Sequence, residues 1–163
     1  QWEMPRQRLI PILLAIQITI CCIGFAYVLS GGIQSAAIKS NPIADLYGWK
    51  IAGQKAAQLS EATNAKGIAV QNWTLGSRAA WYAKPIPVYV LDQRQDQFDL
   101  WFGNLPPGSD IIFINWSGMS FAPSVGNDRY QSTFKNCQPL DSIEVERFGR
   151  ILSKFDFSLC KSW

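Results

Sequence analysis

The chain has 163 residues, 48% of them hydrophobic, which suits one domain with a short additional segment. Its formal net charge of +3 comes from interspersed positive and negative side chains, and this argues against a nucleic-acid partner. The absence of histidine from the sequence disfavours a histidine-based metal site, a Ser-His-Asp triad and a Cys-His dyad. We therefore expect no metal site and no cofactor.

The first predicted element is an apolar helix. Leu9–Leu29 contains no charged residue. At a rise of about 1.5 Å per residue this segment spans about 31 Å, close to the thickness of the bilayer core. Residues 1–32 are thus predicted to be a transmembrane helix with a cytoplasmic flank, and the lipid bilayer is an expected partner. The alternative is a signal peptide, although its apolar region is usually shorter and no clear cleavage site follows here.

The charges that flank this helix predict its orientation. Arg6 and Arg8 precede the apolar run, whereas only Lys39 follows it closely. Positively charged residues favour the cytoplasmic side of a membrane. The sequence therefore places the N-terminus in the cytoplasm and the remaining chain outside.

A linker, residues 33–44, leads to a domain predicted at 45–163. The first half of this domain alternates between amphipathic segments and short apolar ones. Helices are predicted at 47–62 and, capped by Thr74, at 75–83, and strands at 67–73, 88–91 and 110–115. The stretches 92–99 and 117–131 are predicted to be irregular. This order predicts an α/β fold, a small three-layer-like domain with a mainly parallel sheet.

The C-terminal segment predicts an antiparallel hairpin. Apolar and polar residues alternate on both sides of Gly149, as in strands with one buried and one solvent-exposed face. Cys137 and Cys160 lie 12 and 11 residues from Gly149, so a bulge would be needed to place them opposite each other. Outside the cytoplasm a disulfide between them is chemically allowed. The alternative is a pair of buried free thiols.

The segment 92–102 combines acidic, amide and aromatic side chains, and it follows a predicted strand. Loops at the carboxyl ends of parallel strands commonly contact ligands. The candidate binding residues, suited to a sugar or a phosphate, are Arg94, Gln95, Asp96, Gln97, Asp99 and Trp101. The alternative is an ordered loop in which Phe98, Leu100 and Trp101 fill the core. No residue is assigned a catalytic role.

Seven tryptophans are many for a chain of this length. Five of them are expected to build the core or to rest against a membrane-embedded neighbour: Trp49, Trp73, Trp81, Trp101 and Trp116.

Several short motifs resemble a known family. They are Asp45-Leu-Tyr-Gly-Trp49 after the membrane helix, Ala80-Trp81-Tyr82, Pro87-Val-Tyr-Val90, Gln95-Asp-Gln-Phe-Asp-Leu-Trp101 and Gly108-Ser-Asp-Ile-Ile-Phe113. Their order is similar to that of the C-terminal extracytoplasmic domain of bacterial family 39 glycosyltransferases, which are related to protein O-mannosyltransferases and to the aminoarabinose transferases of lipid A. The most specific of the motifs is the Gln-Phe-Asp-Leu-Trp string.

This resemblance implies an integral enzyme of the bacterial inner (cell) membrane. Such an enzyme moves a sugar from a polyprenyl-phosphate donor to a lipid, glycan or protein acceptor. The family's catalytic carboxylate belongs to an early loop between N-terminal membrane helices, which this segment does not include. The resemblance thus implies an accessory extracytoplasmic domain, with a polyprenyl-phosphate-linked sugar as a partner through the membrane region. The alternative is a non-catalytic single-pass membrane protein whose periplasmic domain binds a ligand or a partner.

Overall fold

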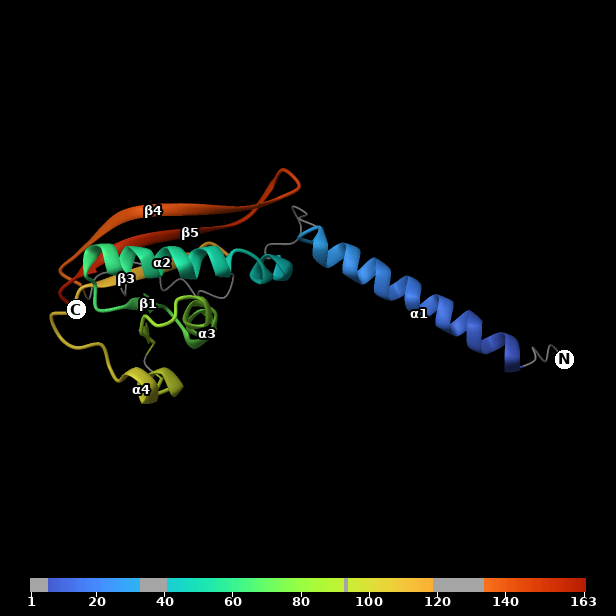
Figure 1. Ribbon diagram of the computed structural model, residues 1–163, viewed down its shortest axis with the longest axis horizontal. Helices are drawn as coiled ribbons and strands as arrows, with labels where there is room; N and C mark the ends of the chain where they lie inside the picture. Colours follow the sequence, from blue (N-terminus) through green and yellow to red (C-terminus); the bar gives the residue numbers. More distant parts are fainter. Residues whose placement is uncertain (1–5, 33–40, 93, 119–133) are drawn as a thin grey trace.

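The computed structural model describes residues 6–32, 41–92, 94–118 and 134–163. It consists of a long N-terminal helix, α1 (Arg6–Leu29), and an α/β domain attached to its C-terminal end (Figure 1). Leu9–Leu29 has a mean hydropathy of 2.4, and none of it is buried by the domain. The helix is therefore long and apolar enough to cross a membrane, as the sequence predicts.

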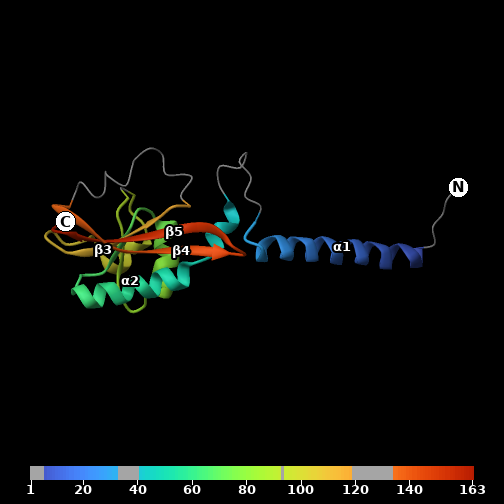
Figure 2. The same cartoon turned by 90° about the horizontal axis from the view of Figure 1, so that it is seen from above.

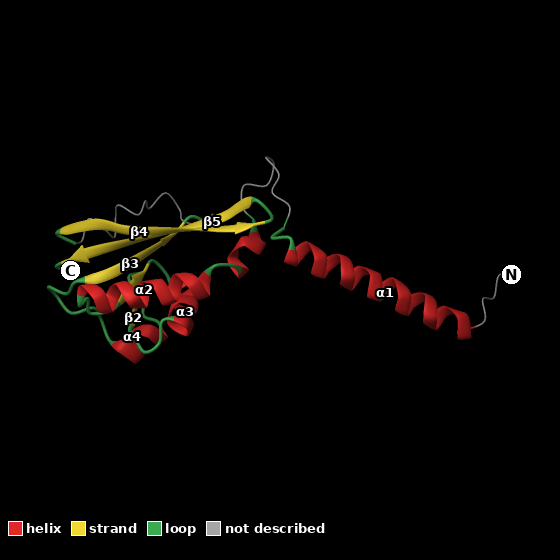
Figure 3. Cartoon of the chain, turned by 45° about the horizontal axis from the view of Figure 1, so that its top comes forward, coloured by secondary structure: helices red, strands yellow, loops and turns green. Residues whose placement is uncertain are grey.

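The domain confirms the predicted α/β class. Its helices and strands, in chain order, are η1 (Pro42–Leu46), α2 (Trp49–Thr63), β1 (Ile68–Val70), α3 (Trp73–Tyr82), β2 (Val88–Val90), α4 (Gln97–Phe102), β3 (Ile111–Trp116), β4 (Asn136–Arg147) and β5 (Arg150–Lys161). The five strands form one sheet in the order β2-β1-β3-β5-β4 (Figure 3). The pairs β1–β2 and β1–β3 are parallel, whereas β3–β5 and β4–β5 are antiparallel.

Two local predictions need correction, one about a helix cap and one about a missed helix. The residue that caps α3 is Asn72, not Thr74, because its side-chain oxygen accepts a hydrogen bond from the backbone N–H of Leu75 at 3.1 Å. The stretch 92–99 is not wholly irregular, since α4 begins at Gln97. Most of the predicted loop 117–131, and residues 33–40 of the predicted linker, lie outside the described residues.

The core lies on both faces of the sheet. On one face, α2 and α3 pack against the strands, and Trp49 forms the centre of this packing. Its ring centroid lies 5.5 Å from that of Trp116 and 4.8 Å from that of Phe155. On the other face, strand residues such as Phe113 pack with side chains from the connecting and terminal segments, among them Leu105 and Phe134.

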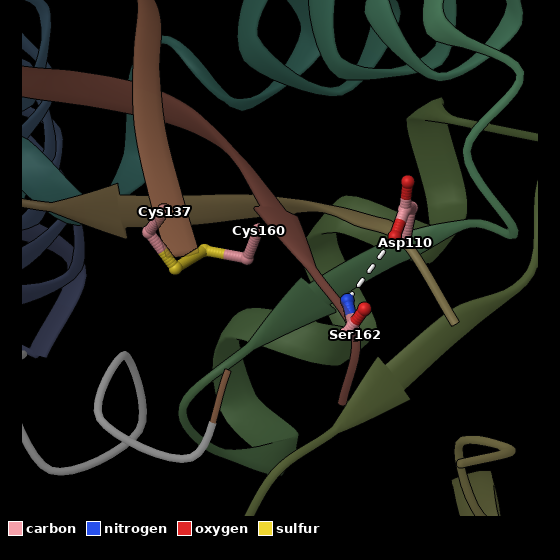
Figure 4. Close-up of a disulfide and its surroundings, with 4 residues drawn as sticks. All are labelled: Asp110, Cys137, Cys160 and Ser162. Atoms are coloured by element: carbon pink, nitrogen blue, oxygen red, sulfur yellow. Dashed lines mark hydrogen bonds between the residues drawn. A yellow bond between two sulfur atoms is a disulfide. The ribbon is translucent and has the colours of Figure 1, made fainter. Parts of the chain in front are cut away.

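The hairpin forms as predicted, and a disulfide joins Cys137 on β4 to Cys160 on β5 (Figure 4). The strands turn through Phe148 and Gly149, and Arg147 pairs with Arg150. The ladder contains two register shifts, after Pro139 and after Val145. They leave out Leu140 on β4 and Leu152 on β5, so their offsets cancel and the two cysteines lie directly opposite each other.

The motif Asp45–Trp49 connects the membrane helix to the domain. The Asp45 carboxylate pairs with the Arg78 guanidinium on α3. The Tyr47 hydroxyl donates a hydrogen bond to the Val28 carbonyl near the end of α1 at 2.6 Å. Gly48 adopts a φ of +87°, which L side chains rarely adopt, and Trp49 enters the core. Each of these four residues therefore has its own structural role at the junction.

Candidate functional site: an aromatic groove between α3 and α4

The segment predicted to bind a ligand surrounds α4, directly after the edge strand β2. Its two carboxylates Asp96 and Asp99 form a capping box. Asp96 accepts a hydrogen bond from the Phe98 N–H at 2.7 Å, and Asp99 accepts one from the Asp96 N–H at 2.8 Å. Such reciprocal bonds satisfy backbone donors that the first helical turn leaves unpaired. The primary role of both carboxylates is thus to start α4.

Arg94 lies in a polar hollow on one side of α4. One of its guanidinium nitrogens is 3.1 Å from an Asp92 carboxylate oxygen, and its backbone N–H donates to the same carboxylate at 3.0 Å. Gln95, Asp99 and Asn104 complete the wall of this hollow. Because the Arg94 charge already has a carboxylate partner, this hollow is a weaker candidate for a phosphate site than the sequence suggests.

Gln97 and Trp101 line a different hollow, an apolar groove of about 340 Å³ between α3 and α4. We call it the α3–α4 groove, and its main walls are Trp81, Lys84, Ile86, Gln97, Trp101 and Phe102. The structure therefore divides the six predicted binding residues among three settings: the helix cap, the polar hollow and this groove.

The aromatic rings of the groove are exposed. Trp81 is 68% exposed and Trp101 is 63% exposed, so neither belongs to the core, and the expectation that they rest against a membrane-embedded neighbour stays a prediction. Trp73 is also largely exposed, whereas Trp49 and Trp116 are buried as expected. The core-filling alternative for the 92–102 segment holds for Phe98 only, because Leu100 is 76% exposed.

The groove combines apolar surfaces with a few polar groups. The Lys84 ammonium lies over the Trp81 ring, 4.8 Å from its centroid. The Gln97 amide lies along the same walls, and so does the Ser77 hydroxyl, which donates its hydrogen to the Trp73 carbonyl at 2.9 Å and could only accept a hydrogen bond from a ligand. A concave, mostly apolar surface with a small number of polar groups is the usual form of a small-molecule site. The groove is suited to binding an amphipathic ligand.

Trp81, Lys84 and Phe102 were not among the candidates from the sequence. Trp81 lies on α3 and Lys84 lies in the turn that follows this helix. They precede the predicted binding segment by 11 and 8 residues, and only the packing of α4 beside the end of α3 brings the two segments together. A buried glycine makes this packing possible. A Cβ at Gly76 would lie 2.8 Å from the Val90 side chain and 3.2 Å from the Phe98 ring.

Within the part of the chain that the structure describes, no group of three or more His, Cys, Asp or Glu side chains is arranged to hold a metal ion. No protein-family model matches the chain. No curated protein and no solved structure matches it either.

Proposed function

We propose that this chain is the membrane-anchored extracytoplasmic domain of a glycosyltransferase, and that its α3–α4 groove binds carbohydrate. The enzyme would transfer a sugar from a polyprenyl-phosphate donor to a lipid, glycan or protein acceptor, with this domain as an accessory to the membrane-embedded catalytic region. The observation that carries the proposal is the pair of exposed tryptophans, Trp81 and Trp101, on the walls of one groove beside a lysine.

The chemistry of the groove matches a sugar phosphate. One face of a sugar ring carries C–H groups that pack on an aromatic ring, and the ring hydroxyls need hydrogen-bonding partners such as the Gln97 amide. The Lys84 ammonium would attract a phosphate as a point charge. This arrangement supports binding, and no residue of the groove is assigned a chemical step.

The extracytoplasmic location is also part of the proposal. The Cys137–Cys160 disulfide supports it, since disulfides persist in oxidising compartments and are rare in the cytosol. The apolar helix α1, with Arg6 and Arg8 at its N-terminal end, supports the same orientation. The bacterial inner membrane is the location that fits both features.

Calorimetry on the full chain in lipid nanodiscs tests the proposal, with a polyprenyl-phosphate sugar and the free sugar as ligands. Trp101→Ala and Trp81→Ala should each weaken binding by about tenfold, or about 1.4 kcal/mol. Trp73→Ala is the matched control, because Trp73 is an exposed tryptophan of α3 that does not line the groove. Equal binding by all three variants, or no binding by the unmodified chain, contradicts the proposal.

A second function, docking of a protein partner, is favoured by the exposure of Leu100 next to Trp101 and Phe102 on α4. Contiguous exposed apolar side chains commonly mark interaction surfaces. Leu100→Glu separates the two functions, since Leu100 does not line the groove. If Leu100→Glu abolishes partner binding and leaves sugar binding unchanged, docking is favoured. If it changes neither kind of binding, the exposed surface around Leu100 is not a docking site.

A further inference from the structure

We infer that the β4–β5 hairpin tip, Arg147–Ile151, is a second membrane contact that inserts into the lipid headgroup region beside α1. Phe148 would enter the apolar edge of the leaflet, and Arg150 would meet lipid phosphates. The inference rests on the part of the proposed function in which α1 spans the bilayer. It goes beyond that function because it adds a lipid-binding surface on the domain.

Direct contacts hold the tip against the end of the membrane helix. A Cβ at Gly31 would lie 2.9 Å from a Leu152 methyl carbon and 3.5 Å from the Arg147 Cβ. The Arg147 guanidinium stacks over the Tyr47 ring at 4.6 Å, and the Tyr47 hydroxyl donates to the Val28 carbonyl. The hairpin reaches the C-terminal end of α1 in two perpendicular views (Figures 1 and 2).

The length of α1 then sets the depth of the tip. Leu9–Leu29 covers about 31 Å, which is the thickness of the hydrocarbon core. Leu29 therefore lies at the outer boundary of the core, and Gly31 lies in the headgroup region. Because Leu152 and Arg147 touch Gly31, the tip that they flank is at headgroup depth.

The side chains of the tip suit this depth. Phe148 is 80% exposed and Ile151 is 53% exposed. Arg150 is exposed, and the structure gives it no ion pair among the described residues. Aromatic and basic side chains together are typical of surfaces that lie in the membrane interface. Glu146, just before the tip, is the acidic residue whose charge opposes anionic lipid.

The backbone of the tip gives an independent reason to infer a membrane contact. Phe148 has a φ of +49° and Gly149 a φ of +73°. Two-residue hairpin turns with positive φ at both positions strongly prefer Asn-Gly, and a bulky aromatic residue is unfavourable at the first position. The turn therefore holds an exposed phenyl ring at a position where Asn would fit the backbone better. Burial of that ring in lipid accounts for its presence.

A spin-label depth measurement on the full chain in vesicles with anionic lipid tests the inference. Cys21 and Cys22 are free cysteines, and replacing both by alanine leaves the native disulfide intact. A nitroxide is then placed at Phe148→Cys, with Ile151→Cys as a second tip site in case the first substitution alters the turn. Ser142→Cys, on the same hairpin about 20 Å from the tip, is the matched water-exposed control.

The label at the tip should collide with oxygen several-fold more, and with a water-soluble nickel chelate several-fold less, than the label at Ser142. Equal accessibility at the tip and at Ser142 overturns the inference, and so does shielding of the tip from both reagents, which indicates a protein contact. A label at Ile18→Cys, in the middle of α1, distinguishes failure of the tip contact from failure of the membrane anchor. Lipid exposure at Ile18 with water exposure at the tip rejects only the tip contact, whereas water exposure at both sites also rejects the membrane anchor.

Discussion

At the scale of single residues, α4 shows how one short helix divides its aromatic side chains between stability and function. Phe98 is 2% exposed and belongs to the main core, whereas Trp101, one turn later, is largely exposed. The rings of the two residues are only 5.4 Å apart. Their separate roles can therefore be tested by the same substitution at each position.

We expect Phe98→Ala to lower the free energy of unfolding by about 3–5 kcal/mol, because it leaves a cavity in a buried site. Trp101→Ala should lower it by no more than about 1 kcal/mol, since the side chain is already in solvent. Denaturant unfolding of the chain in detergent micelles measures both values. If Trp101→Ala lowers the free energy of unfolding as much as Phe98→Ala does, the Trp101 side chain is packed in the core.

Gly48 is a second residue whose role is steric. A Cβ at this position would lie 2.4 Å from a Val145 methyl carbon and 2.8 Å from the Phe155 ring, and φ is +87°. Gly48→Ala should cost about 2–4 kcal/mol, from the left-handed backbone and from overpacking together.

Gly103 provides the matched control for Gly48. Its φ is +72°, but no atom lies within 4 Å of the place of its Cβ. Its ψ is −177°, a combination that essentially only glycine adopts, so Gly103→Ala should cost backbone strain alone, about 1–3 kcal/mol. Thermal unfolding of both variants measures the two losses of stability. Equal losses would show that Val145 on β4 and Phe155 on β5 leave room for a side chain at position 48.

At the scale of elements, the hairpin β4–β5 is held by a covalent bond at one end and by an ion pair with α2 along its length. The disulfide closes a loop with a sequence separation of 23. The double variant Cys137→Ser with Cys160→Ser should lose roughly 3 kcal/mol, mainly because the unfolded chain gains freedom.

Peptide mapping without reductant should first find the two cysteines linked in protein recovered from the membrane. A reductant should then lower the unfolding temperature of the unmodified chain and leave that of the double serine variant unchanged. Recovery of two freely alkylated thiols would refute the disulfide.

The ion pair gives a prediction about pH. The Lys55 ammonium on α2 lies 2.5 Å from a carboxylate oxygen of Asp141 on β4. The hydrogen bond from Lys55, followed by that from the Ser142 N–H, lowers the pKa of Asp141 from its ordinary value. A carboxyl whose pKa is lowered on folding adds stability above its ordinary pKa, and this stability is lost as the pH falls through the folded value.

Lys55→Met should therefore raise the pKa of Asp141 towards its ordinary value and flatten the acid side of the stability curve. An NMR titration of the Asp141 carboxyl carbon in the unmodified chain and in the variant measures the shift. An unchanged pKa for Asp141 would mean that the pair contributes nothing in solution, as many exposed ion pairs do.

At the scale of the whole molecule, the decisive property is the side of the membrane on which the domain lies. Under the proposed orientation, in which the charges around α1 favour a cytoplasmic N-terminus, we expect protease added to intact spheroplasts to remove the domain that follows residue 32. Immunoblots against an N-terminal and a C-terminal tag follow the cleavage, and lysed cells serve as the control for protease access. Full protection of the C-terminal tag in intact spheroplasts would show the opposite orientation, with the domain in the cytoplasm.

Much of the architecture can be predicted from the sequence, since it depends on patterns over short segments. The apolar run Leu9–Leu29, the buried strands and the alternation around Gly149 each indicate one element without knowledge of the others. The disulfide could be predicted for a similar reason, because a hairpin relates its two strands by simple counting. The exact register could not be predicted, because Leu140 and Leu152 are left out of the ladder and the alternation of the sequence does not mark either position.

The candidate site depended on tertiary structure. The sequence by itself determined that 92–102 is rich in groups that can bind ligands, and two of its candidates, Gln97 and Trp101, line the groove. Only the fold decided that Asp96 and Asp99 are used as caps, and that Trp81 of α3 and Lys84 in the following turn complete the groove. Likewise, only the fold decided that the hairpin tip reaches the end of α1. Local patterns determine elements because their causes lie within a few residues, whereas exposure and neighbours depend on how distant elements pack, which no local pattern records.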